Sequence, residues 1–530
     1  MKNSTIPQSI ISGEAVRSSL EDPEKGTVST HLGNPPTGQI VSEHETAGII
    51  SITNTSPSED PPTTSSPHLI DWDGPSDPQK PLNWTSARKF KNIVVICYCT
   101  FLTPLGSTMF APALTSVTQT FNNTNPLLSS FSVSVWILGY FFGPLFIAPL
   151  SELYGRLPIY IACNTLFTIF NIATAVSPSF SALILFRFLA GTFGGCPITI
   201  GAGTFGDLIK PASRGKVIAI WSVGPILGPI LGPIAGGYLG EDVGWRWICW
   251  VLSIAAGVGA FASALLQEET YPPTLLERKA RRLRLETGDA GLKSALSGEK
   301  ESVGRVFARS IVRPLRLLFL SPIVASLSLF QGVSYGFMYL LFTTFPIVFR
   351  DQYGFRTGTV GLTYVGMGIG SILSVIVGGW WTDHIFKTVT RSGKRPFRPE
   401  DRLPPLVWMC FALPVGLFWY GWAVEKKTHW IVPIAGTVWT GIGTNMLMMS
   451  ISTYLIDAHP LYEASATAAA TSVRSLIGAL VPLAGRSMYE TLGLGWGNSL
   501  LGFLALAMCP LPWIFYTYGE RIRTNQRLKL

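Results

Sequence analysis

The segment from Val217 to Leu239 holds three prolines and regularly spaced glycines, yet it carries no charged residue. The prolines stand at positions 225, 229 and 233, and glycines recur at 224, 228, 232 and 236. This composition would break a helix in water. A membrane helix tolerates it, because neighbouring helices, hydroxyl groups or water satisfy the freed backbone groups. The glycines line one face, where another helix backbone can approach closely. The segment therefore predicts a bent, closely packed helix that moves within a membrane protein.

The composition of the whole chain supports this prediction. Of 530 residues, 47% are hydrophobic and only 13% are charged, against about 25% charged in a soluble domain. The seven cysteines all lie in apolar segments without zinc or disulfide spacing, and the six histidines are scattered. No phosphate-binding Gly-x4-Gly-Lys-Ser/Thr motif occurs, and no enzyme signature stands out. We therefore expect no metal, no cofactor and no enzymatic activity.

A spanning helix needs about 20 mostly apolar residues. Twelve segments qualify and predict an all-α polytopic membrane protein: 90–112, 130–150, 158–177, 181–206, 217–239, 245–266, 322–348, 359–381, 404–424, 430–456, 464–486 and 497–518. The longest polar break, 267–321, separates an N-terminal six-helix half (90–266) from a C-terminal one (322–518). Within this central loop, the segment from Glu277 to Arg284 resembles an amphipathic helix on the membrane surface.

The Lys and Arg residues predict the orientation. Eleven of them lie in the loop 267–321 and six in 382–403, whereas the loops on the other side carry few. The net charge of +9 therefore reflects membrane topology and not nucleic-acid binding. Both termini should be cytoplasmic, as an N-terminal tail at 1–89 and a short C-terminal tail at 519–530. The N-terminal tail should be disordered, because its first 69 residues contain no Phe, Trp or Tyr and cannot form a core. The sequon Asn122-Asn123-Thr124 then lies outside the cell, with Asn122 and Asn123 as candidates for glycosylation.

Several local patterns resemble the major facilitator superfamily. Ala148-Pro-Leu-Ser-Glu-Leu-Tyr-Gly-Arg156 is similar to its loop motif between spans two and three, although Leu157 replaces a frequent second basic residue. Leu183 to Gly191 is similar to its intramembrane arginine motif. The set Gly228, Gly232, Pro233, Gly236 and Gly237 resembles the fifth-helix motif of proton-coupled exporters.

Further patterns resemble one branch of this superfamily, the fungal drug:proton antiporters with twelve spans. The stretch from Asp71 to Trp84 is similar to the lead-in of that group. Tyr454-Leu-Ile-Asp457 and Arg474-Ser-Leu-Ile-Gly-Ala479 are similar to its tenth and eleventh helices. The resemblance implies two six-helix halves around a central cavity that opens alternately to each side, in a monomer of the cell membrane.

Charged residues within or beside the spans are candidates for proton coupling and gating. Arg187 lies about six residues, or roughly 9 Å, inside the fourth span and should face the bundle interior. Arg474 lies about ten residues into the eleventh span, where a role in transport and a hydrogen bond to a neighbouring carbonyl remain equal alternatives. Glu152, Arg156, Asp207 and Asp457 lie at inner span ends, where they could latch the halves together or remain wetted interfacial charges.

Polar residues within apolar spans are candidates for the substrate cavity. Gln331, Tyr335 and Tyr339 share one face of the seventh span, and Asn445 lies within the tenth. Aromatic rings with a few polar groups suit amphiphilic organic ligands, although ordinary helix packing explains the tyrosines equally well.

The resemblance implies a proton-coupled antiporter that exports small amphiphilic organic compounds such as drugs, toxins or secondary metabolites. Its partners would be this substrate, protons and the lipid bilayer. Two alternatives remain open: a proton-coupled importer or polyamine transporter on the same fold, and a membrane receptor that senses a ligand without transporting it.

Overall fold

The computed structural model describes residues 69–296, 303–392, 398–459 and 463–525. The disorder predicted for the N-terminal tail falls mainly on residues 1–68, which lie outside the described residues. The last part of the predicted C-terminal tail, 526–530, lies outside them as well.

Eleven of the described segments are long and apolar enough to cross a membrane, and the last of these contains two passes. It runs from Glu463 to Thr524 and is interrupted at Gly493, whose φ of 74° and ψ of 172° are not helical. The chain turns at this glycine, which separates the two helical parts of the segment. The twelve passes agree with the twelve predicted from the sequence.

The passes form two sets of six. The first set consists of α1 (Ser86–Met109), α3 (Pro126–Tyr154), α4 (Arg156–Ala175), α5 (Phe180–Gly194) continued by α6 (Cys196–Leu208), α7 (Pro211–Asp242) and α8 (Trp245–Leu266). The second set consists of α11 (Pro322–Tyr353), α12 (Thr357–Leu362) continued by α13 (Val365–Ser392), α14 (Pro404–Met409) continued by α15 (Ala412–Glu425), α16 (Ile431–Ala458), α17 (Glu463–Met508) and α18 (Pro510–Asn525). The short α2 (Leu114–Thr120) and the 3-10 turns η1 (Pro81–Asn83) and η2 (Pro399–Arg402) lie between passes.

Polar residues at the first turns explain where several passes begin. The side chains of Asn125, Ser179 and Ser321 accept hydrogen bonds from backbone N–H groups at the starts of α3, α5 and α11. These bonds satisfy donors that a helix leaves without an intrahelical partner. Proline follows Asn125 and Ser321 directly, where its missing N–H costs nothing.

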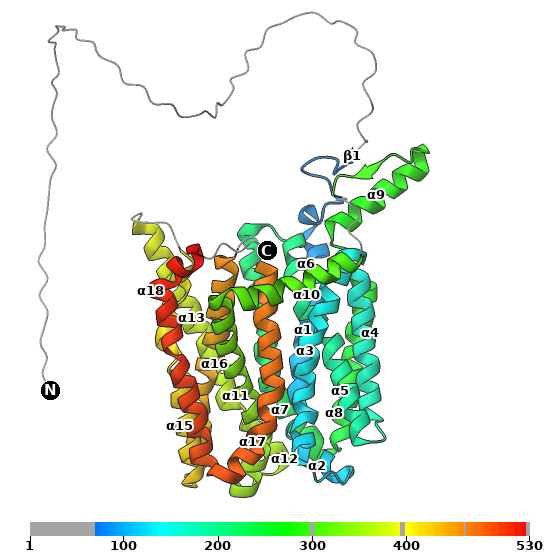
Figure 1. Ribbon diagram of the computed structural model, residues 1–530. Helices are drawn as coiled ribbons and strands as arrows, with labels where there is room; N and C mark the ends of the chain where they lie inside the picture. The colour runs from blue at the N-terminus through cyan, green and yellow to red at the C-terminus, as the bar shows by residue number, and fades with distance from the viewer. Residues whose placement is uncertain (1–68, 297–302, 393–397, 460–462, 526–530) are drawn as a thin grey trace, which may run out of the picture. The chain divides into compact units, whose positions relative to one another are not determined.

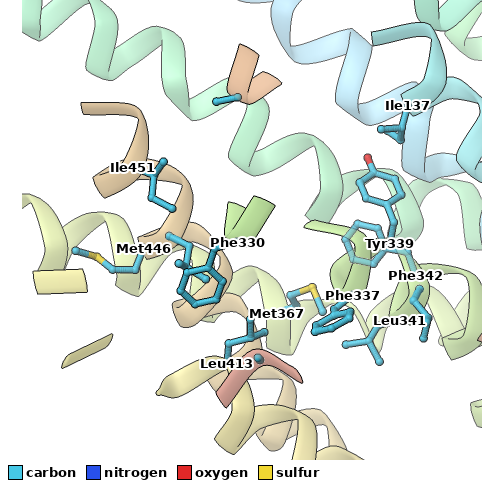
Figure 2. Packing of buried hydrophobic residues seen from close by; sticks show 14 of the residues in the cluster. Ile137, Phe330, Phe337, Tyr339, Leu341, Phe342, Met367, Leu413, Met446 and Ile451 are labelled. Atoms are coloured by element: carbon cyan, nitrogen blue, oxygen red, sulfur yellow. The ribbon is translucent and has the colours of Figure 1, made fainter. Parts of the chain in front are cut away.

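Aromatic and aliphatic side chains fill the second set. Figure 2 shows Phe330 and Phe337 of α11 among Met367 of α13, Leu413 of α15 and Met446 of α16. Helix α11 also packs along α17, where Gly332 and Gly336 face Val473, Ile477 and Val481. A β-carbon at Gly336 would lie 3.0 Å from the side chain of Val481. Small residues therefore bring the α11 and α17 backbones together, as in other membrane helix pairs.

The lead-in from Asp71 to Trp84 binds the segment that follows the first set. Helix α9 (Pro272–Thr287) presents Lys279, whose Nζ donates to Asp73 Oδ1 at 2.6 Å and to the carbonyl oxygen of Asp71 at 3.1 Å. A two-residue parallel ladder joins β1 (Leu69–Ile70) to β2 (Lys293–Ser294) beside this helix. We call the end of the bundle that carries these segments the loop end, and the opposite end, with α2 and α12, the far end.

This arrangement corrects the expectation that residues 277–284 lie on the membrane surface. Ala280 and its neighbour Leu276 on α9 are fully buried within the protein, and the helix contacts both short strands. The apolar face of α9 is thus covered by the chain itself. A different helix, α10 (Val303–Leu320), lies across the loop end in Figure 1 and contacts both α3 of the first set and α17 of the second.

Candidate functional site

At the loop end, the structure brings two of the four predicted gating residues together. Arg156, the first residue of α4, places its Nε 3.4 Å from Asp207 Oδ2 near the end of α6. The same guanidinium donates through Nη1 to Ser151 Oγ at 2.8 Å. Both partners in the ion pair are largely buried. Because the pair joins residues of the first set only, it ties α4 to α6 and not one set to the other.

Sequence reasoning missed Glu269, which completes this cluster. Its carboxylate is buried and accepts hydrogen bonds from the backbone N–H groups of Arg156 at 2.9 Å and Leu157 at 3.2 Å. It also accepts from the N–H groups of Thr270 and Tyr271. A carboxylate at a helix N-terminus satisfies free donors and interacts favourably with the helix dipole. Glu269 therefore caps α4 from the segment that follows α8, a contact that sequence proximity does not reveal.

Asp457, the third predicted gating residue, belongs to a corresponding pair in the second set. Its Oδ2 accepts from Nε of Arg402 at 2.8 Å. Arg402 precedes the ninth pass as Arg156 precedes the third, and Asp457 ends the tenth pass as Asp207 ends the fourth. The two sets thus repeat the same ion pair, as an internal duplication would leave. Sequence reasoning named Asp457 but missed its partner Arg402.

Glu152, the fourth predicted gating residue, is exposed. Among the described residues it forms no ion pair, although it lies within electrostatic range of Tyr271. The structure therefore does not join Glu152 and Asp457, and the proposed latch between the sets is not formed in this conformation. Its role in another conformation stays a prediction.

In the interior of the first set, Arg187 of α5 is almost completely buried, with 2% of its surface exposed. Its Nε donates to the carbonyl oxygen of Ser132 at 2.7 Å, and its Nη2 lies 3.4 Å from that of Ser107. The guanidinium carbon lies 4.1 Å from the ring centre of Phe110 and 5.1 Å from that of Trp136. Carbonyl groups and aromatic rings thus hold this charge between α1, α3 and α5, as expected for an arginine that faces the bundle interior.

The residue that holds Arg187 also connects the two sets. Ser107 Oγ lies 2.9 Å from the hydroxyl of Tyr339 on α11, and both groups are buried. Figure 2 shows the Tyr339 hydroxyl pointing toward Ile137 of the first set. The ring of Tyr335 lies 4.9 Å from that of Tyr339, and the guanidinium carbon of Arg474 lies 5.3 Å from the Tyr335 ring. A continuous chain of contacts therefore runs from Arg187 to Arg474 across the interface.

We call Arg187, Ser107, Tyr339, Tyr335 and Arg474 the central cluster. Sequence reasoning named four of its members and placed Tyr335 and Tyr339 on one helix face, but it did not connect them to either arginine and it missed Ser107. A serine in an apolar span gives little signal, because a helix interior satisfies most hydroxyl groups through the carbonyl one turn earlier.

The other two predicted cavity residues lie differently. Gln331 is one turn before Tyr335 on α11 and is buried, and its Oε1 accepts no hydrogen bond from the described residues. Asn445 is half-buried on α16 and makes no hydrogen bond to the central cluster within the described residues. Gln331 thus shares its helix and face with two members of the central cluster, whereas a role of Asn445 in a cavity stays a prediction.

The glycines of α7 pack against α1. A β-carbon at Gly228 would lie 2.8 Å from the Leu105 N atom, and one at Gly236 would overlap the carbonyl oxygen of Met109. A β-carbon at Gly232 would likewise lie too close to atoms of Thr108 and Leu105. The carbonyl oxygen of Pro233 lies against Gly361 of α12.

The same helix reaches the second set at the far end. A β-carbon at Gly237 would lie 2.8 Å from the carbonyl oxygen of Thr357. Glu241 Oε2 accepts a hydrogen bond from the N–H of Gly358 at 2.6 Å. Helix α7 therefore lies between α1 and α12, in contact with both sets.

The predicted glycosylation site lies in the turn before α3 at the far end. Asn122 is exposed and has a positive φ of 50°. The amide of Asn123 is engaged in the turn, since its Nδ2 donates to Ser129 Oγ at 3.1 Å. Of the two candidates, Asn122 is the one that begins the sequon and has the accessible side chain. Glycosylation itself stays a prediction.

No group of three or more His, Cys, Asp or Glu side chains in the described part of the chain could hold a metal ion. The arrangement offers instead buried guanidinium groups, hydroxyl groups and aromatic rings at a contact between two helix sets. Such groups can bind and orient a small molecule, but they do not form a nucleophile–base pair of the kind that covalent catalysis requires.

Comparison with known proteins agrees with this architecture. The chain is 52% identical over 465 residues to the MFS-type transporter penM of Penicillium rubens, covering 88% of this chain and 91% of that protein. It is 48% identical to the efflux pump radE of Floropilus chiversii, covering 88% and 86% of the two chains. The xylose transporter XylE from E. coli, in a partially occluded inward open conformation, superposes with a TM-score of 0.61 at 16% identity and covers 81% of this chain and 98% of its own.

The family model described as Major Facilitator Superfamily matches residues 96–482, which include most of both helix sets. The twelve helical passes and the ion pair that is repeated in both sets are consistent with this family match. The chain is a multi-pass membrane transporter and not an enzyme, and it belongs to the Major Facilitator Superfamily.

Proposed function

We propose that the protein exports small amphiphilic organic compounds in exchange for protons, by alternating access between two six-helix halves (90–266 and 322–518). The central cluster carries this proposal. It places charged, hydroxyl and aromatic groups from both helix sets at one contact, where a ligand would touch both sets at once. A ligand held in this way senses, and can bias, the arrangement of the two sets.

The ion pairs at the loop end are consistent with sets that move as units. Arg156 with Asp207, and Arg402 with Asp457, each strengthen one set internally. The hydrogen bond from Gly358 to Glu241 joins the sets at the far end. Alternating access requires this far-end contact to break while the internal pairs persist. Asp207 is a largely buried acidic group beside Arg156, and we propose it as a site where proton binding could be coupled to that change.

Two further observations support the proposed direction of transport and the proposed orientation of the protein in the membrane. The relative radE is named an efflux pump, and we extend that direction of transport to this chain. The basic residues concentrated in 267–321 and 382–403 favour a cytoplasmic loop end. Both termini then lie on the cytoplasmic side of the cell membrane. We propose that the protein acts as a monomer, since the central cluster is complete within one chain.

Accumulation of fluorescent organic compounds in yeast cells with and without the protein tests this proposal at two external pH values. Cells that express the protein should accumulate less compound, and the difference should grow at the lower external pH because the inward proton gradient is larger. A protonophore should abolish it. Greater accumulation in the expressing cells would indicate import, and equal accumulation of every compound would contradict transport.

A further inference from the structure

We infer that the exported compound is an organic acid whose anionic group binds Arg474 in the central cluster. This inference rests on the export function proposed above and names the class of substrate. It depends on two positive charges, those of Arg187 and Arg474, which no acidic side chain of the described residues neutralises.

Arg474 is a half-buried charged side chain that forms no ion pair with the described residues. It lies eleven residues into α17, about 16 Å along the helix and therefore near the middle of a bilayer core about 30 Å thick. Its Nε is buried and donates no hydrogen bond to the described residues. Its guanidinium carbon lies 5.3 Å from the centre of the Tyr335 ring, over the face of that ring. A guanidinium nitrogen that is buried without an acceptor is costly, so this nitrogen is suited to bind an acceptor that arrives with a ligand.

Arg187 adds a second positive charge to the same cluster. Its Nε and Nη2 donate to two carbonyl oxygens, which do not neutralise its charge. The Tyr140 hydroxyl lies within electrostatic range of both guanidinium groups, which shows that their fields overlap. Arg187 therefore favours a nearby anion through its charge, while its donors remain bound to α1 and α3.

Acidic side chains do not compensate these two charges. Within the described part of the chain, no Asp or Glu oxygen lies within ion-pair distance of Arg187 or Arg474. The described acidic residues of the passes lie toward the helix ends, as Glu152, Asp207 and Asp457 do. In an environment of low dielectric, a cationic ligand would be repelled and a neutral one would leave both charges uncompensated.

The neighbouring groups define the rest of the ligand. The rings of Tyr335 and Tyr339 offer an aromatic surface beside the guanidinium of Arg474. Gln331 Oε1 is a buried acceptor that has no donor among the described residues, and it suits a hydroxyl or amide of the same compound. The structure thus points to a carboxylate, or an acidic phenol or enol, attached to a flat apolar body. This chemistry argues against a polyamine as the substrate.

Three probes with the same apolar body test this inference: 1-pyrenebutyrate, its neutral amide and 4-(1-pyrenyl)butylammonium. Their binding to the purified full-length protein in detergent can be followed by energy transfer from tryptophan to pyrene. The carboxylate should bind about tenfold more tightly than the amide, as expected for a charge-assisted contact, and the ammonium more weakly than either. Arg474→Gln should remove the preference for the carboxylate and leave amide binding unchanged.

Two further variants distinguish charge from folding. Arg474→Lys keeps the charge and should retain a preference for the carboxylate. Arg486→Gln removes an arginine from an exposed pair with Glu490 on the same helix and should change no affinity. All variants are compared by thermal unfolding, so that a misfolded variant is recognised and Arg474→Lys then replaces Arg474→Gln in the comparison.

Carboxylate binding that is equal to or weaker than amide binding, or absent, would overturn the inference. So would an Arg474→Gln variant that weakens all three probes equally. Gradient-driven export of the amide or the ammonium by the same protein reconstituted into liposomes would leave the export function standing. The two proposals can therefore fail separately.

Discussion

The carboxylate of Glu269 occupies the space beside Gly155 that a β-carbon would fill. Gly155 also has a φ of 97°, a conformation that other residues adopt only with strain. Two independent constraints therefore require glycine at the turn that precedes Arg156. This contact fixes the start of α4 and, with it, the position of the arginine that pairs with Asp207.

Replacing Gly155 by alanine should therefore destabilise the first helix set. The strained φ costs about 1–3 kcal/mol, and the displaced Glu269 carboxylate would leave backbone donors of α4 without an acceptor. The melting temperature of the purified protein should fall by several degrees, and the yield of folded protein should decrease. Gly379→Ala is the matched control, since a β-carbon there has no atom within 4 Å and should change neither quantity. An unchanged melting temperature for Gly155→Ala would contradict the assigned contact.

Glu152→Ala should abolish export without lowering thermal stability. In this conformation the side chain is exposed and forms no ion pair with described residues, so its removal should cost little. A loss of flux would then reflect a contact made only in another conformation, as the latch hypothesis requires. The measurements are flux and melting temperature on the same preparation. Full transport by Glu152→Ala would remove the latch hypothesis.

The glycines of α7 should differ in their tolerance of alanine according to their distance from α1. A β-carbon at Gly236 would overlap the Met109 carbonyl oxygen, whereas one at Gly224 would lie 3.2 Å from the nearest atoms of Phe101. Gly236→Ala should therefore force α7 away from α1 and reduce both stability and flux, and Gly224→Ala should have a much smaller effect. Equal effects of the two substitutions would contradict the close packing of these helices.

Acid should release the lead-in from α9 only at low pH. Burial alone would raise the pKa of Asp77, but the N–H groups of Asp73 and Gln79 and the ammonium of Lys279 outweigh it and lower this pKa below its ordinary value. A group with a lowered pKa stabilises the folded form above its unfolded pKa of about 4, and this contribution is lost as the pH falls through the folded value. Between pH 8 and pH 5, docking should therefore not change.

Limited proteolysis of the segment 70–84 measures this docking. Asp77→Asn should increase cleavage at pH 7, because the amide retains the shape of the side chain but loses the charge that binds Lys279. The wild-type protein should become equally sensitive only below about pH 4. A cleavage rate that rises in the wild type between pH 8 and pH 5 would show that another group controls the contact.

The sequence predicted the twelve passes because a bilayer requires long apolar helices, a signal that each segment carries by itself. The break between the predicted spans 464–486 and 497–518 followed from the same pattern, and the chain turns within it at Gly493. The packing of α9 was wrongly predicted because its amphipathic pattern fits a lipid surface and a protein partner equally well. Only the tertiary structure shows that Leu276 and Ala280 are buried within the protein and that the lead-in, about 200 residues earlier, binds Lys279 of the same helix.

The candidate site was predicted residue by residue but not as an arrangement. Arg187 and Arg474 stand out in the sequence because charges within spans are costly. Their link through Ser107, Tyr339 and Tyr335 joins residues from both helix sets, and no local pattern encodes it. Glu269 and Arg402 escaped notice for a related reason, since a charged residue in a polar loop gives no sign of its distant partner.

Flux of 1-pyrenebutyrate in proteoliposomes under an imposed pH gradient, with the membrane potential clamped by potassium and valinomycin, tests the central claim most directly. Liposomes without protein supply the passive distribution to be subtracted. The account predicts protein-dependent flux opposite to the proton flow, which reverses when the pH gradient is reversed. Flux that ignores the pH gradient, or that does not exceed the protein-free control, would contradict proton-coupled export.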